Sequence, residues 1–256
     1  RQEQLCLYLS KNNPYAVHLH RQLELIYVLS GYTTVTVEQQ DFLLTPGQGV
    51  LVFPNQMHGL KHVEPGQNLL CIFEPDFCHS FRQFFQNKKP AHNDFTVSSL
   101  SEHSRIALQG LKTLAAAMEK DRPTPSDVQV YAEGYLTHLL ADLLPSLPLQ
   151  VRKHTDDLEL EQRLLLYLDA HYTEELSLES LSKEFGVSRF VLSRIFTEKL
   201  HTTFPDYVNS RRLDYARDLL LSTELSVTQI ALDVGFGSSR TLFRAFHSAC
   251  HSTPGA

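Results

Sequence analysis

The last third of the sequence contains an internal repeat, which sharply limits the folds open to the chain. Residues 176–196, LSLESLSKEFGVSRFVLSRIF, match residues 225–246, LSVTQIALDVGFGSSRTLFRAF, with one extra residue in the turn of the second copy. Each copy predicts a short apolar helix, a turn opened by Gly186 or Gly235, and a second amphipathic helix that begins after a serine. Because a glycine that ends one helix lets the next helix cross it, the repeat predicts two helix-turn-helix units.

The second helix of each copy has one apolar face and one polar face. In the first copy, helical spacing places Leu192, Ile195 and Phe196 inward. The outward positions are Arg189, Ser193, Arg194 and Thr197 in the first copy and Arg240, Thr241, Arg244 and His247 in the second. An outward arginine can donate two hydrogen bonds to one guanine in the major groove. The alternative is an ordinary helical hairpin with a solvated face, but the arginine repeated in both copies favours DNA binding.

Length, charge and cysteine content set the class of protein. A chain of 256 residues, 42% of them hydrophobic, is long enough for two domains. The net charge of −6 argues by itself against a nucleic-acid partner, but the residues from Ser177 onward include nine Lys or Arg and eight acids, so the negative charge lies elsewhere. The four cysteines form no C-x-x-C pair, and no apolar run approaches the roughly 20 residues of a membrane span. We expect a cytoplasmic protein without membrane contact and, because the chain begins without Met, a piece of a longer one.

The first third of the chain is typical of strands. Short β-branched or alternating runs such as LELIYVL, YTTVTVE and GVLVF are separated by turns that pair Gly with Ser or Pro. Closely spaced short strands predict a small antiparallel barrel or jelly roll. After Phe77 the hydrophobic period becomes that of two amphipathic helices. The polar stretch after Pro148, residues 149–157, is the best candidate for an interdomain linker.

Residues 158–256 resemble the DNA-binding domain of the AraC family of bacterial transcription regulators. VTQIALDVGF at 227–236 is similar to the family's I-x-x-I-A-x-x-x-G-F signature, and Thr253-Pro254 is similar to its closing T-P. YVNSRRLDYARDLL at 207–220 resembles the helix that joins the family's two helix-turn-helix units. By position, the resemblance implies base-reading residues at Phe190, Ser193 and Arg194 in the first unit and at Arg240, Thr241 and Arg244 in the second.

Other basic residues near these helices have two interpretations. Lys199, Arg211 and Arg212 either contact DNA phosphates or are solvated or salt-bridged within the protein. The joining helix, about 22 Å long, suits two recognition helices on one face of the duplex. We therefore expect one chain to cover two major-groove segments about one helical turn apart.

Two segments of the first third resemble the motifs of cupin barrels. HLHRQLELIYVLSG at 18–31 has the pattern H-x-H-x3-E-x6-G, and GVLVFPNQMHGL at 49–60 resembles the second motif. In metal-binding cupins two histidines, a glutamate and a later histidine hold one ion. The corresponding residues here are His18, His20, Glu24 and His58. The two early histidines share a strand face at period 2. The second motif departs from the family's P-x-G-x-x-H, because it is one residue short and lacks the Gly.

Regulators of the AraC family commonly keep such residues in a sensor domain that binds a small effector, frequently a sugar, without catalysis. The resemblance therefore implies an effector pocket at these four residues. The alternatives are a bound, non-catalytic metal ion, or histidines that merely belong to the core or surface, so we expect no cofactor other than such a metal. The competing function is a metal-dependent cupin enzyme with an appended helical domain, but no additional general acid or base stands out in the barrel segment.

These features together predict an α+β protein. We expect a cupin-like β-barrel with helices at 1–148, a linker at 149–157, and an all-α domain of two helix-turn-helix units at 158–256. The expected function is non-enzymatic transcription regulation, with promoter DNA, a small-molecule effector and a second copy of the chain as partners, and RNA polymerase as a further candidate. An apolar stripe on the second helix predicts either a seat for a partner helix or packing on the chain's own barrel. Its residues are Val128, Tyr131, Tyr135, Leu139 and Leu143.

Overall fold

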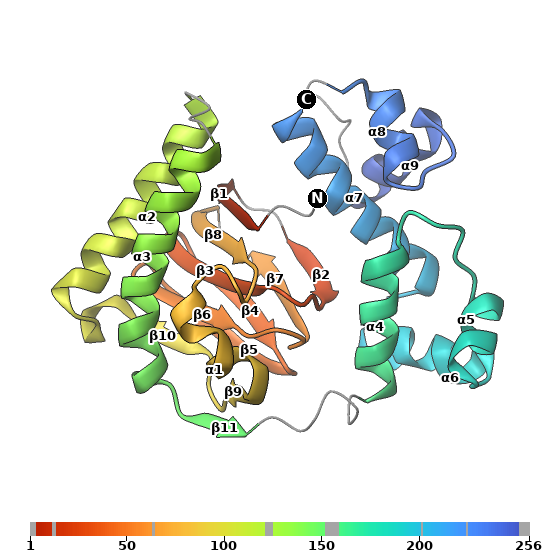
Figure 1. The fold of residues 1–256 in the computed structure, drawn as a ribbon. Coiled ribbons are helices and arrows are strands. Elements are labelled where there is room, and N and C mark those ends of the chain that lie inside the picture. The colour runs from red at the N-terminus through yellow and green to blue at the C-terminus, as the bar shows by residue number, and fades with distance from the viewer. Residues whose placement is uncertain are drawn as a thin grey trace. The chain divides into compact units, whose positions relative to one another are not determined.

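The computed structural model describes residues 4–11, 14–62, 65–120, 125–151, 159–200, 202–223 and 225–250. Contacts divide the chain into two compact units, Arg1–Leu158 and Glu159–Ala256. The first unit contains antiparallel sheets and helices, and the regular elements described in the second unit are helices (Figure 1). The predicted α+β fold is confirmed.

The larger sheet of the first unit has five strands, and all its pairings are antiparallel. Their order is β1 (Leu5–Lys11), β8 (Gln67–Phe73), β3 (Leu23–Ser30), β6 (Gln48–Val52) and β10 (Asp94–Thr96). Strand β3 lies at the centre of this sheet. Because side chains alternate along a strand, Leu23 and Leu25 point to one face of the sheet, and Glu24 and Ile26 point to the other.

A second sheet of four strands packs against the Ile26 face of the larger sheet. Its order is β2 (Tyr15–His18), β7 (His58–His62), β4 (Thr33–Val37) and β5 (Gln40–Leu44). Strand β5 shows the alternation that its sequence predicts: Phe42 and Leu44 are buried between the sheets, whereas Leu43 is 63% exposed. Two antiparallel sheets around one core agree with the small antiparallel barrel that the strand pattern predicts.

Two long helices cover the other face of the larger sheet (Figure 1). They are α2 (Glu102–Lys120) and α3 (Pro125–Ser146), and they pack on each other. A Cβ atom at Gly110 of α2 would lie only 2.4 Å from a ring carbon of Tyr135 on α3, so glycine allows the helices to approach this closely. Their apolar side chains join those of the sheet in the largest core cluster.

The apolar stripe predicted on α3 packs mainly within its own unit. Val128, Leu139 and Leu143 are buried in the core under α3, and Tyr135 packs against that core. Tyr131 is the exception, since it is 59% exposed. The structure therefore favours packing on the chain's own barrel for four of the five residues.

Short elements complete the first unit and correct the predicted linker. They are the 3-10 turns His79–Phe81 and Val97–Ser99, helix α1 (Arg82–Asn87), and strands β9 (Lys88–Pro90) and β11 (Leu149–Val151). Strands β9 and β11 pair in antiparallel register, with Leu149 opposite Pro90. The first three residues of the predicted linker at 149–157 thus belong to a strand, because pairing with β9 satisfies backbone groups that a linker leaves to water. Residues 152–158 lie outside the described part of the chain.

The second unit is a series of helices. They are α4 (Leu160–His171), α5 (Leu178–Phe185), α6 (Arg189–Arg194) with a π-helical turn at Ile195–Lys199, α7 (Phe204–Ser222), α8 (Val227–Asp233) and α9 (Ser239–Cys250). The hydroxyls of Ser177, Thr203 and Ser226 cap α5, α7 and α8, each accepting a hydrogen bond from the backbone N–H three residues on. No helix in the described segments is both long enough and apolar enough to cross a membrane.

Candidate functional site: a buried histidine cluster and two helix-turn-helix units

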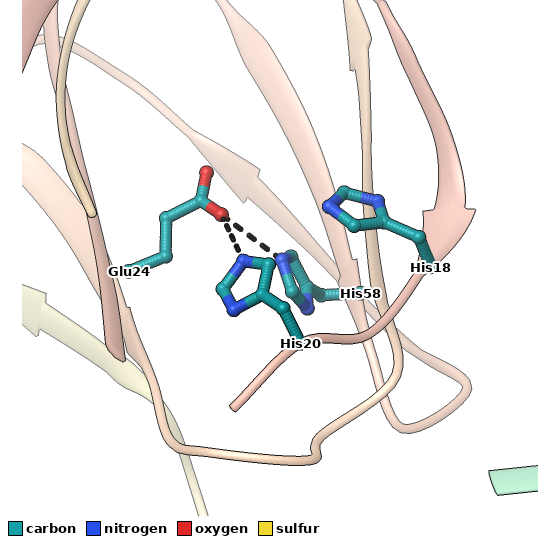
Figure 2. A group of neighbouring side chains, drawn as sticks. All are labelled: His18, His20, Glu24 and His58. Atoms are coloured by element: carbon teal, nitrogen blue, oxygen red, sulfur yellow. Dashed lines mark hydrogen bonds and ion pairs between the residues drawn. The ribbon is translucent and has the colours of Figure 1, made fainter. Parts of the chain in front are cut away.

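The four residues singled out by the cupin resemblance lie together in the barrel (Figure 2). His18 ends β2, Glu24 is in β3 and His58 begins β7, while His20 lies between β2 and β3. His18 and His20 are each 7% exposed, Glu24 is 4% exposed and His58 is 2% exposed. One possible ligand atom from each residue lies within 4.8 Å of the other three. The structure therefore brings together all four predicted effector-site residues.

Strand register and one unusual turn account for this convergence. His18 is opposite His58 in the pairing of β2 with β7, and their ring centroids are 4.4 Å apart. The shortened turn before His58 places Asn55 at a φ of +59°, a left-handed conformation that Asn tolerates better than most residues. The Asn55 backbone N–H donates to the His20 carbonyl oxygen at 2.8 Å. This bond joins the two segments that carry the histidines.

Glu24 contacts two of the histidines through one oxygen. Its Oε2 atom lies 3.1 Å from His20 Nε2 and 3.0 Å from His58 Nε2 (Figure 2). The Nδ1 atoms of these rings lie 3.2 Å from the Gln22 carbonyl oxygen and 2.9 Å from the Gln56 carbonyl oxygen, respectively. Because a carbonyl oxygen only accepts, each Nδ1 carries a proton. Nε2 is then the atom that faces Glu24: it donates a hydrogen bond to the carboxylate, or it presents its lone pair to a metal ion where one is bound.

The cluster keeps Glu24 ionised. Burial on its own raises the pKa of the Glu24 carboxyl, but hydrogen bonds with His20 and His58 and the charges of those rings outweigh burial. The pKa of Glu24 is therefore held well below its usual value. A buried negative charge thus lies directly against the His20 and His58 rings.

The donor set fits a divalent transition-metal ion. Imidazole nitrogen and carboxylate oxygen are the ligands of many zinc, iron, manganese and copper sites. The carbonyl oxygens bonded to Nδ1 hold His20 and His58 in the tautomer whose Nε2 binds a metal. The same polar groups also suit the hydroxyls of a small organic ligand.

A buried amide network behind the cluster went unpredicted. Gln56 Oε1 accepts hydrogen bonds from the Phe53 backbone N–H at 2.9 Å and from Asn93 Nδ2 at 2.7 Å. Asn93 Nδ2 also lies 2.7 Å from the Leu51 carbonyl oxygen. The network fixes the turn whose Gln56 carbonyl contacts His58. Gln56 lies inside the second cupin motif, which was an available signal, whereas nothing in the local sequence of Asn93 marks its role.

The first helix-turn-helix unit consists of α5 and α6. Between them Gly186 has a φ of +67°, in the left-handed region that glycine enters without strain. The Ser188 hydroxyl caps α6 by accepting a hydrogen bond from a backbone N–H at 3.3 Å. Leu192, Ile195 and Phe196 are buried, as their spacing predicts.

The second unit consists of α8 and α9, and its turn packs against neighbouring segments. Gly235 has a φ of +88°, and a Cβ atom there would lie 2.7 Å from the Thr173 carbonyl oxygen and 3.0 Å from Arg212 Nε. The Ser238 hydroxyl caps α9 by accepting a hydrogen bond from a backbone N–H at 3.3 Å. Leu242 is fully buried under α9. The two units therefore share one design, and the second is packed more closely at its turn.

The predicted DNA-binding residues lie on the second helix of each unit. Six are exposed and one, Ser193, is half-buried. The exposed residues are Arg189, Phe190, Arg194, Arg240, Thr241 and Arg244. Phe190 is 70% exposed, which is unusual for a large apolar side chain. It borders a surface depression of about 790 Å³ at the start of α6.

Arg194 has a partner on its own helix. Its guanidinium donates two hydrogen bonds to the carboxylate of Glu198, one turn further on. The hydrogen bonds lower the pKa of the Glu198 carboxyl, which is therefore ionised at neutral pH. Both side chains are more than half exposed, so solvent and salt screen the pair.

Lys199 and Arg211 make contacts inside the second unit. The Lys199 ammonium forms an ion pair with Glu161 of α4. Arg211 is 6% exposed, and its guanidinium lies 2.9 Å from the Asp169 carboxylate, also on α4. Of the two interpretations of these residues, the structure thus supports the salt-bridged one.

Arg212 connects α7 to the end of α4. Its Nε donates to the Tyr172 carbonyl oxygen at 2.7 Å, and its Nη2 donates to the Glu174 carbonyl oxygen at 2.8 Å. A cation at this place satisfies carbonyls that a helix C-terminus leaves unpaired. Because the turn at Gly235 also packs here, α7, the end of α4 and the second helix-turn-helix unit meet at Arg212.

Two family models match this chain. A helix-turn-helix domain model matches residues 181–256, and a cupin domain model matches residues 12–73. The cupin match contains His18, His20, Glu24 and His58. The helix-turn-helix match contains α5 from Leu181 onward, the whole of α6, α8 and α9, and Thr253-Pro254, which lies outside the described residues.

Curated relatives match about a third of the chain. The regulatory protein SoxS of Escherichia coli is 34% identical over 93 residues, which is 36% of this chain and 87% of SoxS. An uncharacterized HTH-type transcriptional regulator of Staphylococcus aureus is 39% identical over 88 residues, which is 34% of this chain. The aligned part spans only 12% of the length of that staphylococcal relative.

Solved structures match over nearly the whole chain. Apo ToxT of Vibrio cholerae aligns with a TM-score of 0.57 at 16% identity, covering 98% of this chain and 95% of ToxT. ToxT bound to an unsaturated fatty acid aligns with a TM-score of 0.53 at 17% identity, covering 98% of this chain and 92% of ToxT. These likenesses show a shared fold. With its helix-turn-helix and cupin matches and its similarity to most of SoxS, the chain belongs to the AraC family of bacterial transcription regulators.

Proposed function

We propose that this chain is a sequence-specific transcription regulator that binds double-stranded promoter DNA and responds to a ligand in its barrel. The observation that carries the proposal is the pair of exposed arginines, Arg194 and Arg244, at matched positions in two helix-turn-helix units. If only one of the two units bound DNA, the other unit would not need an exposed arginine at the matched position. The similarity of the chain to SoxS supports the same conclusion.

The exposed side chains suit direct reading of bases. In a helix-turn-helix the second helix enters the major groove. There an arginine fork matches the two acceptors of guanine, and an apolar side chain such as Phe190 contacts the thymine methyl group. Ser193 and Thr241 add hydroxyls that either donate or accept hydrogen bonds. Each unit thus offers chemistry that distinguishes one base pair from another.

The ligand of the barrel is proposed to bind at His18, His20, Glu24 and His58. Their donor set supports a divalent metal ion, or a small polar molecule held directly or through that ion. When bound, the ion supplies positive charge that neutralises the buried Glu24 carboxylate. The expectation that the effector is a sugar stays a prediction.

Regulation without catalysis is favoured over the alternative of a metal-dependent cupin enzyme. The curated relatives that match the chain are a regulatory protein and HTH-type transcriptional regulators. A DNA-reading domain serves a sensor directly, whereas it has no evident use in a cupin enzyme. The expected cytoplasmic location is part of this proposal, because a promoter-binding protein works where the chromosome is.

A second copy of the chain is the proposed protein partner. On α3, Val130 is 70% exposed and Tyr131 is 59% exposed, whereas Val128, Leu139 and Leu143 of the apolar stripe are buried. Exposed apolar side chains on a long helix favour pairing with the same helix of another copy. Contact with RNA polymerase stays a prediction that rests on the family resemblance.

Selection of binding sequences from a random duplex pool with the full chain tests DNA reading. We expect enrichment of two short conserved blocks about one helical turn apart, with both blocks protected in a footprint of the selected site. Equal binding to selected and random duplexes would exclude the proposal. In parallel, native mass spectrometry and elemental analysis of the purified protein identify the barrel ligand, and turnover of a substrate by metal-loaded protein would establish the enzyme instead.

A further inference from the structure

A small cavity lies between the larger sheet and α2. Tyr27 and Leu29 of β3 form one wall and Leu108 of α2 the other, and the cavity volume is about 210 Å³. Because side chains alternate along β3, Tyr27 and Leu29 lie on the opposite face of the strand from Glu24. The cavity is thus separate from the histidine cluster, which lies between the two sheets.

The helix wall of the cavity carries positive charge. Arg105, Leu108, Gln109 and Lys112 line it, and their spacing of three, four and seven residues puts them on one face of α2. Arg105 is paired with Glu102 at 3.1 Å. Lys112 is half-buried, and no carboxylate in the described part of the chain lies within ion-pair distance of it. None of the described residues lining the cavity is acidic.

The sheet wall offers apolar surface and few free polar groups. The backbone groups of this wall are hydrogen-bonded to one another. Gly47 N–H donates to the Val28 carbonyl oxygen at 3.0 Å, and Val97 N–H donates to the Gly47 carbonyl oxygen at 2.8 Å. A Cβ atom at Gly47 would lie 3.3 Å from Val97, so glycine keeps this side open. A ligand therefore meets hydrocarbon on the sheet side and polar side chains on the helix side.

We propose that this cavity binds a small organic anion with a short apolar body. Its carboxylate meets the Lys112 ammonium, and the Gln109 amide, one helical turn away, donates a second hydrogen bond. The hydrocarbon part lies against Tyr27 and Leu29. A volume of 210 Å³ holds roughly seven groups the size of a water molecule. Pentanoate has this size and charge, and such a ligand bridges the sheet and α2.

Titration calorimetry of the full chain with sodium pentanoate tests this site. We expect saturable binding of pentanoate, and at least about tenfold weaker binding of pentan-1-ol, which has the same chain without the charge. Lys112→Gln should weaken pentanoate binding by a similar factor, because it removes the charge but keeps a polar side chain of related length. Lys61→Gln is the matched control, since Lys61 is exposed on β7 and does not line the cavity.

Three results would overturn the assignment of this cavity. Unchanged affinity in Lys112→Gln would show that pentanoate binds elsewhere on the protein. Equal affinity for pentanoate and pentan-1-ol would mean non-specific apolar binding, and a lack of saturable heat would mean that the cavity takes no such anion. Circular dichroism of each variant establishes that a loss of binding does not reflect unfolding. The result does not depend on DNA reading or on metal binding by the histidine cluster.

Discussion

Arg194 and Glu198 are joined by two hydrogen bonds of 2.8 Å each on the exposed side of the first helix-turn-helix unit. The guanidinium fork that would contact a guanine is therefore occupied by a carboxylate of the same helix in the free protein. DNA binding has to break this pair. It also has to bring the Glu198 charge close to the phosphates, which is unfavourable.

Glu198→Gln should therefore strengthen binding to the selected site. The expected gain is about two- to fivefold, the range typical of one exposed ion pair, and it should shrink as salt concentration rises. Fluorescence anisotropy at several salt concentrations measures it. Glu184→Gln removes an exposed charge from α5 of the same unit and serves as the control. Equal gains in both variants would mean that only net charge matters.

Arg194→Ala and Arg244→Ala should each weaken binding to the selected site by about 5- to 150-fold and relax specificity at one base position. Binding to random DNA should change far less. Affinities for the site and for its single-base variants measure both effects. Arg82→Ala, at an exposed, ion-paired arginine of the other unit, should change neither. Equal losses on specific and random DNA would identify phosphate contacts instead.

DNA binding should depend on the spacing between the two protected DNA segments. Insertion of about five base pairs between the protected blocks turns one block to the opposite face of the duplex. Because the two units are joined by one helix, α7, which Arg212 fastens to the end of α4, the protein should not follow, and high-affinity binding should be lost. Gel-shift titrations of the original and lengthened duplexes measure the loss. Unchanged affinity would mean that only one unit reads DNA.

The two turn glycines should differ in their tolerance of substitution. Gly186→Ala forces a side chain into a left-handed conformation but meets no atom within 4 Å, so we expect a loss of about 1–2 kcal/mol. Gly235→Ala adds a clash with the Thr173 carbonyl and should cost more, about 2–4 kcal/mol. Urea unfolding of the full chain, followed by a helix signal, compares them. A smaller loss for Gly235→Ala would contradict the packing at that turn.

Metal removal tests the histidine cluster. If His18, His20, Glu24 and His58 hold a divalent ion, EDTA should lower the thermal midpoint of the purified protein, and adding back the ion found by elemental analysis should restore it. At a free metal concentration of 100 times the dissociation constant, binding adds about 2.7 kcal/mol to the free energy of unfolding. His20→Ala should abolish the shift, whereas His103→Ala, at an exposed histidine of α2, should keep it. A thermal midpoint that changes neither with EDTA nor with added metal would favour an organic effector.

Local patterns in the sequence predicted most of the fold and the residues of the cluster. The burial of Leu192 and Phe196 and the cap at Ser188 follow from helical period and local hydrogen bonding, which do not depend on distant residues. His18 and His20 belong to one local motif of the β2–β3 region, so their shared position was accessible as well.

Long-range contacts were not accessible in this way. Arg211 and Arg212 look like DNA-binding side chains in the sequence, and only the folded chain brings them to Asp169 and to the carbonyls after α4. The same holds for Asn93 and for the pairing of β11 with β9. Each of these contacts joins segments that are far apart in the sequence, so no local pattern specifies the partner.

Strand β3 is a shared wall between two interiors. Glu24 belongs to the histidine cluster, while Leu23 and Leu25, its immediate neighbours, belong to the core beneath α2 and α3. Neighbouring residues of one strand thus face the histidine cluster on one side and the core under the helices on the other. Because close-packed cores resist compression, a ligand that displaces the backbone at Glu24 has to displace the leucines on the far side of the strand as well.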